Sequence, residues 1–201
     1  MLFSRHFENK ENSTENLERL LKLLLSGMLT LFDTQFYARV VSRNVLKDVI
    51  LFFVNTLNDK VLEKFEESEL SIQCVNRLLL RVITNSDKTS CLGASIKLLQ
   101  DLSENSNTSP ALLKLVMKCI WKLTHLLPDY ISEVKLEVVL VDIHTFYKVL
   151  PASFWKARAE RVPQQTIKAL LQTLCKLRGN QVRLLILPVL KTGGFFKSVM
   201  Q

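Results

Sequence analysis

Apolar residues recur along this chain at every third or fourth position, the spacing that gathers them on one face of an α-helix. The pattern stops and restarts, and it predicts seven amphipathic helices. We expect five of them at about residues 13–31, 39–57, 110–127, 132–150 and 163–179, and two more that begin near residue 68 and after residue 87.

Several residues mark where these helices begin and end. Ser109 followed by Pro110 predicts a start, because serine caps a helix and proline fits its first position. Pro128 is expected to stop that helix, and Gly179 to end the last one. Helix starts recur about 20–30 residues apart, so helix pairs repeat at close to the HEAT and armadillo period of about 40–47 residues. The sequence therefore predicts an all-α, HEAT-like helical repeat, with a compact helical bundle as the alternative.

Composition fits a globular chain and excludes several classes. Of 201 residues, 48% are hydrophobic and 23% charged, and glycine and proline number five each. So few turn-forming residues argue against a turn-rich β-sandwich. No apolar run suits a membrane span, and the charges of the first twelve residues do not suit a signal peptide. The four cysteines lack the close spacing of a zinc site, so we expect reduced thiols and no metal or cofactor.

Catalytic motifs are absent from the sequence. There is no phosphate-binding loop, no dinucleotide-binding glycine pattern and no zinc-protease motif. Asp142 and His144 stand two positions apart, which on a helix directs them to opposite sides. We therefore expect neither an enzyme nor a small-molecule substrate.

Charge is distributed unevenly along the chain. Residues 1–147 hold 17 Lys/Arg and 18 Asp/Glu, a net charge of −1, whereas residues 148–201 hold 10 Lys/Arg and one acid, a net charge of +9. A basic end on a neutral body suggests an acidic partner, either a nucleic acid or an acidic protein surface. A solvated basic face with no partner is the alternative. Nucleic-acid binding is disfavoured, because the sequence offers no series of aromatic residues for base stacking.

The two tryptophans have different sequence contexts. Trp121 has apolar neighbours within a predicted helix, and we expect it in the core. Trp155 lies in a break between helices, beside basic residues, where it could anchor a partner or fill the gap between two helices. The candidate partner-binding residues are Trp155, Lys156, Arg158, Arg161, Lys168, Lys176 and Arg178. We expect the six basic ones to be mostly exposed, and several of them to share one surface.

Three segments carry a family resemblance. They are Leu115–Leu123 (LVMKCIWKL), Leu140–Val149 (LVDIHTFYKV) and Thr166–Gly179 (TIKALLQTLCKLRG), with weaker similarity in Ser71–Leu78 (SIQCVNRL). Residues 111–179 resemble the C-terminal region of the ch-TOG / mini spindles family of microtubule polymerases. The resemblance implies a TOG-like helical repeat domain at residues 13–179, between a flexible N-terminus (1–12) and a divergent tail (180–201).

The resemblance also implies a function. We expect a non-catalytic interaction module that helps target a microtubule polymerase to centrosomes and spindle poles, within the cytoplasm and cytoskeleton, through TACC-type coiled-coil partners. An auxiliary module that binds microtubules or tubulin is the alternative. Typical TOG domains grip tubulin with their turns, using a tryptophan in the first and basic residues later. Here the first turn, Asp33–Tyr37, has aromatic residues but no tryptophan, and the turn Asn85–Lys88 has one lysine.

Overall fold

The structure is a stack of antiparallel helices. The computed structural model describes the backbone of residues 2–59, 68–156, 158 and 161–190, and the side chains within 16–59, 68–156, 158 and 161–182. These residues form nine helices and no strand: α1 (Leu2–Asp33), α2 (Gln35–Arg39), α3 (Arg43–Asn58), α4 (Ser68–Asn85), α5 (Lys88–Glu104), α6 (Pro110–Tyr130), α7 (Leu136–Val149), α8 (Ala152–Lys156) and α9 (Val162–Leu190). The all-α helical repeat predicted from the sequence is confirmed.

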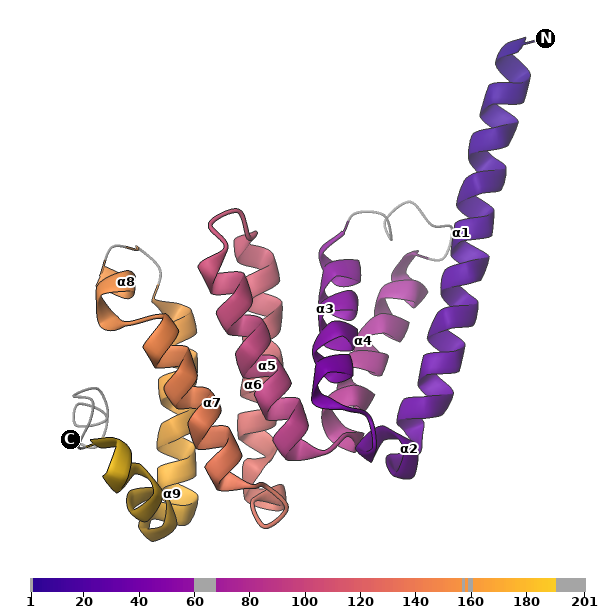
Figure 1. Cartoon of the computed structure of the whole chain (residues 1–201). Coiled ribbons are helices and arrows are strands. Elements are labelled where there is room, and N and C mark those ends of the chain that lie inside the picture. The colour runs from indigo at the N-terminus through magenta and orange to yellow at the C-terminus, as the bar shows by residue number, and fades with distance from the viewer. Residues whose placement is uncertain (1, 60–67, 157, 159–160, 191–201) are drawn as a thin grey trace.

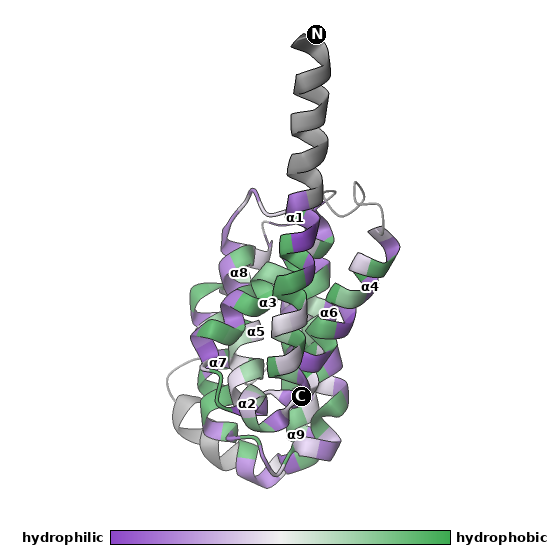
Figure 2. Ribbon diagram, turned by 90° about the vertical axis from the view of Figure 1, so that its right-hand side faces the viewer, coloured by the Kyte–Doolittle hydropathy of each residue, from purple (hydrophilic) through white to green (hydrophobic). Residues whose placement is uncertain are grey.

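The helices form two layers. One layer holds α3, α5 and α7, and the other holds α1, α4, α6 and α9; neighbours within each layer contact one another (Figure 1). Figure 2 looks along the stack from the α1 end, and apolar side chains of both layers form the buried core. α5 packs against α3, α6 and α7, so most of its side chains are buried. The core is therefore continuous along the stack, as expected of a helical repeat.

Side-chain caps begin several helices where the sequence predicts a start. Ser109 accepts a hydrogen bond from the backbone N–H of Leu112 at 3.1 Å, with Pro110 at the first helical position. Asp87 caps α5 in the same way through the N–H of Ser90 at 2.8 Å. These caps satisfy backbone donors that the first helical turn leaves without an intrahelical partner.

Helix boundaries differ from the sequence expectation in three places. α1 begins at Leu2, so its backbone includes residues that the sequence sets apart as an N-terminal segment. α6 continues through Pro128 to Tyr130, because a proline near the end of a helix costs only one hydrogen bond. α9 is interrupted at Arg178, beside the predicted end at Gly179, and then resumes to Leu190. The division into domains at residues 12 and 179 stays a prediction.

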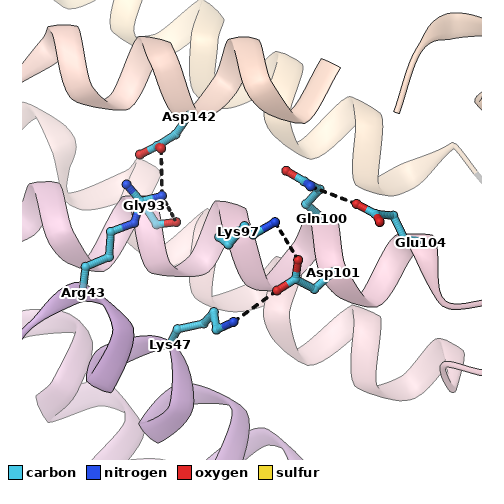
Figure 3. Close-up of polar contacts among 8 residues, drawn as sticks. All are labelled: Arg43, Lys47, Gly93, Lys97, Gln100, Asp101, Glu104 and Asp142. Atoms are coloured by element: carbon cyan, nitrogen blue, oxygen red, sulfur yellow. Dashed lines mark hydrogen bonds and ion pairs between the residues drawn. The ribbon is translucent and has the colours of Figure 1, made fainter. Parts of the chain in front are cut away.

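A charged bridge crosses the outside of α5. Arg43 of α3 donates from Nη2 to Oδ1 of Asp142 on α7 at 2.7 Å and to the carbonyl oxygen of Gly93 at 3.1 Å (Figure 3). The crossing is close, since a Cβ atom built on Gly93 would lie 2.7 Å from both Arg43 Cζ and Asp142 Oδ2. Glycine is thus required at this position for the bridge to form.

Lysines of this layer are also paired. Lys47 and Lys97 both contact the carboxylate of Asp101, at 3.2 and 2.9 Å (Figure 3). Arg43, Lys47 and Lys97 on the α3 and α5 side of the stack are therefore each neutralised by a carboxylate.

Among the described helices, none is long and apolar enough to span a membrane.

Candidate interaction surface

Trp155 lies in the core. Its side chain is 2% exposed, and its indole N–H donates to the carbonyl oxygen of Leu150 at 3.0 Å. The ring stacks on Phe146 of α7 with centroids 6.1 Å apart, and it meets Phe154 edge-on. The short helix α8 turns this side chain inward, so Trp155 fills the gap after α7. Of the two roles that the sequence left open, this packing favours filling the gap between helices, because the ring is buried in the isolated chain.

The basic residues predicted with Trp155 lie at different depths. Four are exposed, namely Lys156, Arg161, Lys168 and Lys176. Arg158 is half-buried: it donates to the carbonyl oxygen of Ser103 at 2.8 Å and its guanidinium lies 4.3 Å from the centroid of the Phe154 ring. Arg158 thus has a structural role as well as a charge.

The same residues spread along the length of α9 and its preceding segment. Lys156 and Arg158 lie in or beside α8 at one end, next to the start of α9 (Figure 1). Arg178 lies at the interruption of α9 and helps line a cavity of about 390 Å³ with residues of the α6–α7 turn and of the first turn of α7, including Glu137. From residue 162 to residue 178 a helix rises about 24 Å. Lys168 and Lys176 lie between these ends, and a single surface shared by the basic residues stays a prediction.

Trp121, expected in the core, is instead 47% exposed. Its indole N–H donates to the hydroxyl oxygen of Thr166 on α9 at 3.2 Å. That hydroxyl is itself fixed, since it donates to the carbonyl oxygen of Val162 at 3.0 Å. The expectation was wrong because Trp121 stands three positions after Lys118. This spacing places it on the solvent-exposed side of α6, with the lysines, and not on the apolar side. The helical spacing of the lysines could have revealed this position.

Trp121 belongs to a set of exposed basic and polar residues on the two contacting helices α6 and α9, and we name this surface the α6–α9 face. Its members, all exposed, are Lys114, Lys118, Trp121, Lys122 and His125 of α6 with Gln165, Lys168, Gln172 and Lys176 of α9. Residues 110–128 and 162–182 contain no aspartate or glutamate. Within the described part of the chain, no ion pair involves these lysines. The α6–α9 face therefore differs from the α3 and α5 side of the stack, where Arg43, Lys47 and Lys97 are paired with carboxylates.

The turns along one edge form a second exposed region. Phe36 and Val40, in and next to α2, are each 74% exposed. Arg39 is paired with Glu133 of the α6–α7 turn at 3.0 Å. This edge offers apolar side chains, and its arginine is already neutralised.

Lys88, the one lysine of the α4–α5 turn, points inward. It is 4% exposed and its ammonium donates to the carbonyl oxygens of Ile83, Thr84 and Ser86 at the end of α4. Its Nζ also lies 4.6 Å from the centroid of the Tyr130 ring. Burial lowers the pKa of Lys88, and the carbonyl oxygens hold its position. Lys88 cannot reach a partner from this turn.

The sequence is similar to long proteins with spindle and centrosome names. Protein mini spindles of Drosophila melanogaster is 28% identical over 159 residues, 79% of this chain. Protein MOR1 of Arabidopsis thaliana is 29% identical over 178 residues, 82% of this chain. The resemblance to the ch-TOG / mini spindles family is confirmed. Centrosomal protein 224 of Dictyostelium discoideum is more distant, 24% identical over 173 residues, 82% of this chain.

The similarity to the ch-TOG / mini spindles family concerns a small part of each relative. This chain spans 8–9% of the length of the three proteins. No family model matches the sequence, and no solved structure matches it. Two of the segments that carry the resemblance, Leu115–Leu123 and Thr166–Gly179, supply Trp121 and Lys168 to the α6–α9 face. The region that resembles the family is thus also the region that carries the unpaired basic surface.

Proposed function

We propose that this chain is a non-catalytic interaction module of a microtubule polymerase. In this proposal it helps bring the polymerase to centrosomes and spindle poles, through TACC-type coiled-coil partners. The observation that carries the proposal is the similarity to mini spindles and to centrosomal protein 224 across about four-fifths of the chain. A rigid helical stack suits such a role, because it presents extended surfaces to a partner.

The charge of the α9 side supports an acidic partner. Lys156, Arg161, Lys168 and Lys176 are exposed, and acids are absent from α9 up to residue 182. Like charges that face water accelerate the encounter with a surface of the opposite sign. Lys168 and Lys176 lie two helical turns apart on α9, and reversing both to glutamate should slow association and weaken its dependence on salt. Stability should change by no more than about 0.5 kcal/mol.

A direct microtubule- or tubulin-binding module is the second proposal. The exposed apolar residues at the first turn, Phe36, Tyr37 and Val40, favour it. The burial of Lys88 and the pairing of Arg39 with Glu133 speak against it, since neither of these two cations is available to acidic tubulin.

One experiment separates the two proposals. The full chain is incubated with microtubules and, separately, with a purified TACC-family coiled coil, at low and at high salt. Binding to the coiled coil without microtubules present would support the targeting role. If the chain pellets with microtubules when no coiled coil is present, and this is lost at high salt, the direct microtubule-binding role is supported. Binding to neither would refute both.

A further inference from the structure

We infer that the α6–α9 face is a docking surface for an acidic helix of a protein partner, with Trp121 as its central apolar contact. The inference deepens the proposed function. It rests on that proposal for one point, namely that the partner is a coiled-coil protein. It names a surface that differs from the turn edge and from the residues around α8.

The first argument is the contrast between the paired cations of α3 and the exposed lysines of the α6–α9 face. On the α3–α5–α7 side, Arg43 and Lys47 are held by carboxylates within hydrogen-bond distance. On the α6–α9 face the lysines are exposed. Residues 110–128 of α6 and residues 162–182 of α9 contain no aspartate or glutamate. A helix face with several exposed lysines and no nearby acid presents a positive surface to an acidic partner.

The second argument is the position and fixation of Trp121. The Trp121 side chain is 47% exposed, and it stands between the exposed Lys118 and Lys122 in α6. Its N–H is satisfied by Thr166, which is 2% exposed and bonded in turn to the backbone of α9. A ring already held in one orientation loses little rotamer freedom when a partner covers it. Tryptophan in such a setting commonly contributes most of the energy of an interface.

The third argument is the spacing of the charges. Lys114, Lys118 and Lys122 repeat every four residues, which makes a row about 12 Å long. Lys168 and Lys176 make a second row of similar length on α9, a helix that packs against α6 and is bonded to it through Trp121 and Thr166. Carboxylates repeated every fourth residue on a helix are spaced about 6 Å apart. The rows therefore match an acidic helix, whereas a single aromatic residue does not make the stacking platform that single-stranded nucleic acids need.

Matched variants of the full chain test the surface. The site variants are the double reversal Lys118→Glu/Lys168→Glu and the single change Trp121→Ala. The control is Lys135→Glu/Lys148→Glu, which changes net charge equally at exposed positions preceding and within α7. Binding to a TACC-family coiled coil is measured by surface plasmon resonance. A change of Trp121 fluorescence on binding, recorded in a Trp155→Phe background, reports directly on the ring.

We expect each site variant to weaken binding at least about tenfold and the control to stay within about twofold. The double reversal should act mainly on the association rate, and Trp121→Ala mainly on the dissociation rate. Circular dichroism checks the fold, and Trp121→Leu replaces Trp121→Ala if that variant unfolds. If the wild type binds but the site variants lose no more than the control, the surface is wrong and the targeting proposal stands.

A second probe keeps the two proposals distinguishable. A synthetic helical peptide with glutamate at every fourth position is offered to the same variants. Binding that the site variants lose supports the surface even if the coiled coil does not bind, in which case the targeting proposal fails alone. Absence of binding to both probes overturns the surface. Tighter binding to a DNA duplex than to either protein probe also overturns it, because the inference commits to a protein helix.

Discussion

Replacing Gly93 by alanine should destabilise the protein, although alanine is the better helix former. The change lies inside α5, where a gain of about 1 kcal/mol is expected from helix propensity alone. The new Cβ, however, would lie 2.7 Å from Arg43 Cζ and from Asp142 Oδ2, closer than non-bonded atoms approach. These are side-chain atoms, so the bridge between α3 and α7 is expected to open while α5 stays in place.

The net effect follows from what the bridge contributes. Its Arg43–Asp142 contact is a charged hydrogen bond of 2.7 Å between side chains that are 36% and 12% exposed. Such bonds contribute about 1.5–3 kcal/mol, and the exposure of Arg43 places this one near the lower value. Loss of the bond to the Gly93 carbonyl adds about 1 kcal/mol. Subtracting the propensity gain leaves a destabilisation of about 1–2 kcal/mol.

A double-mutant cycle tests the reasoning. Gly93→Ala is measured by urea unfolding, followed by circular dichroism, in the wild type and in an Arg43→Ala/Asp142→Ala background. Without the bridge there is nothing for the Cβ to displace, so the same change should stabilise by up to about 1 kcal/mol. Equal destabilisation in both backgrounds would refute the argument, because the new Cβ would then clash with atoms other than those of the Arg43–Asp142 bridge.

The remaining predictions concern the depth of particular side chains in the fold. In urea unfolding, Trp155→Ala should lower the free energy of unfolding by about 3–5 kcal/mol, and Trp121→Ala by less than about 2 kcal/mol. The reverse order would contradict the buried position of Trp155 and the exposed position of Trp121. Burial raises the pKa of Cys91 and of Cys119 to about 12, so a thiol reagent at neutral pH should leave both unmodified in the native protein. Because the folded state keeps protons that the unfolded state releases, stability should fall as pH rises from about 9 toward 12; a flat profile would refute this. Lys88→Met should cost about 2–3 kcal/mol in the same assay, since the α4 carbonyls lose their donor, and no loss would show that water replaces it.

The order of the helices could be read from the sequence because it depends on local chemistry. Ser109 with Pro110 predicts the start of α6, and Asp87 that of α5, since a cap acts within its own turn. The short helix α2 was missed, because five residues do not establish a period. The continuation of α6 past Pro128 was missed for a different reason, namely that the penalty of proline depends on how many turns follow it.

The candidate site was less predictable, because it depends on contacts between distant residues. The sequence shows that Lys168 and Lys176 share a face of α9, but not that α6 lies beside it with Trp121 bonded to Thr166. The depth of the two tryptophans was also beyond local patterns. Trp155 is buried because α8 folds back onto Phe146, a contact that residue spacing does not encode.

The bridge from Arg43 to Asp142 also bears on how the stack unfolds. In helical repeats each unit normally couples to its immediate neighbours, so an array can lose its units one at a time from either end. Here α3 and α7 are joined to each other as well as to α5, which lies between them. Loss of α7 therefore removes a partner from α3, two helices away in the layer. The central three helices should open as one cooperative unit in hydrogen exchange, with the ends of the stack exchanging before them.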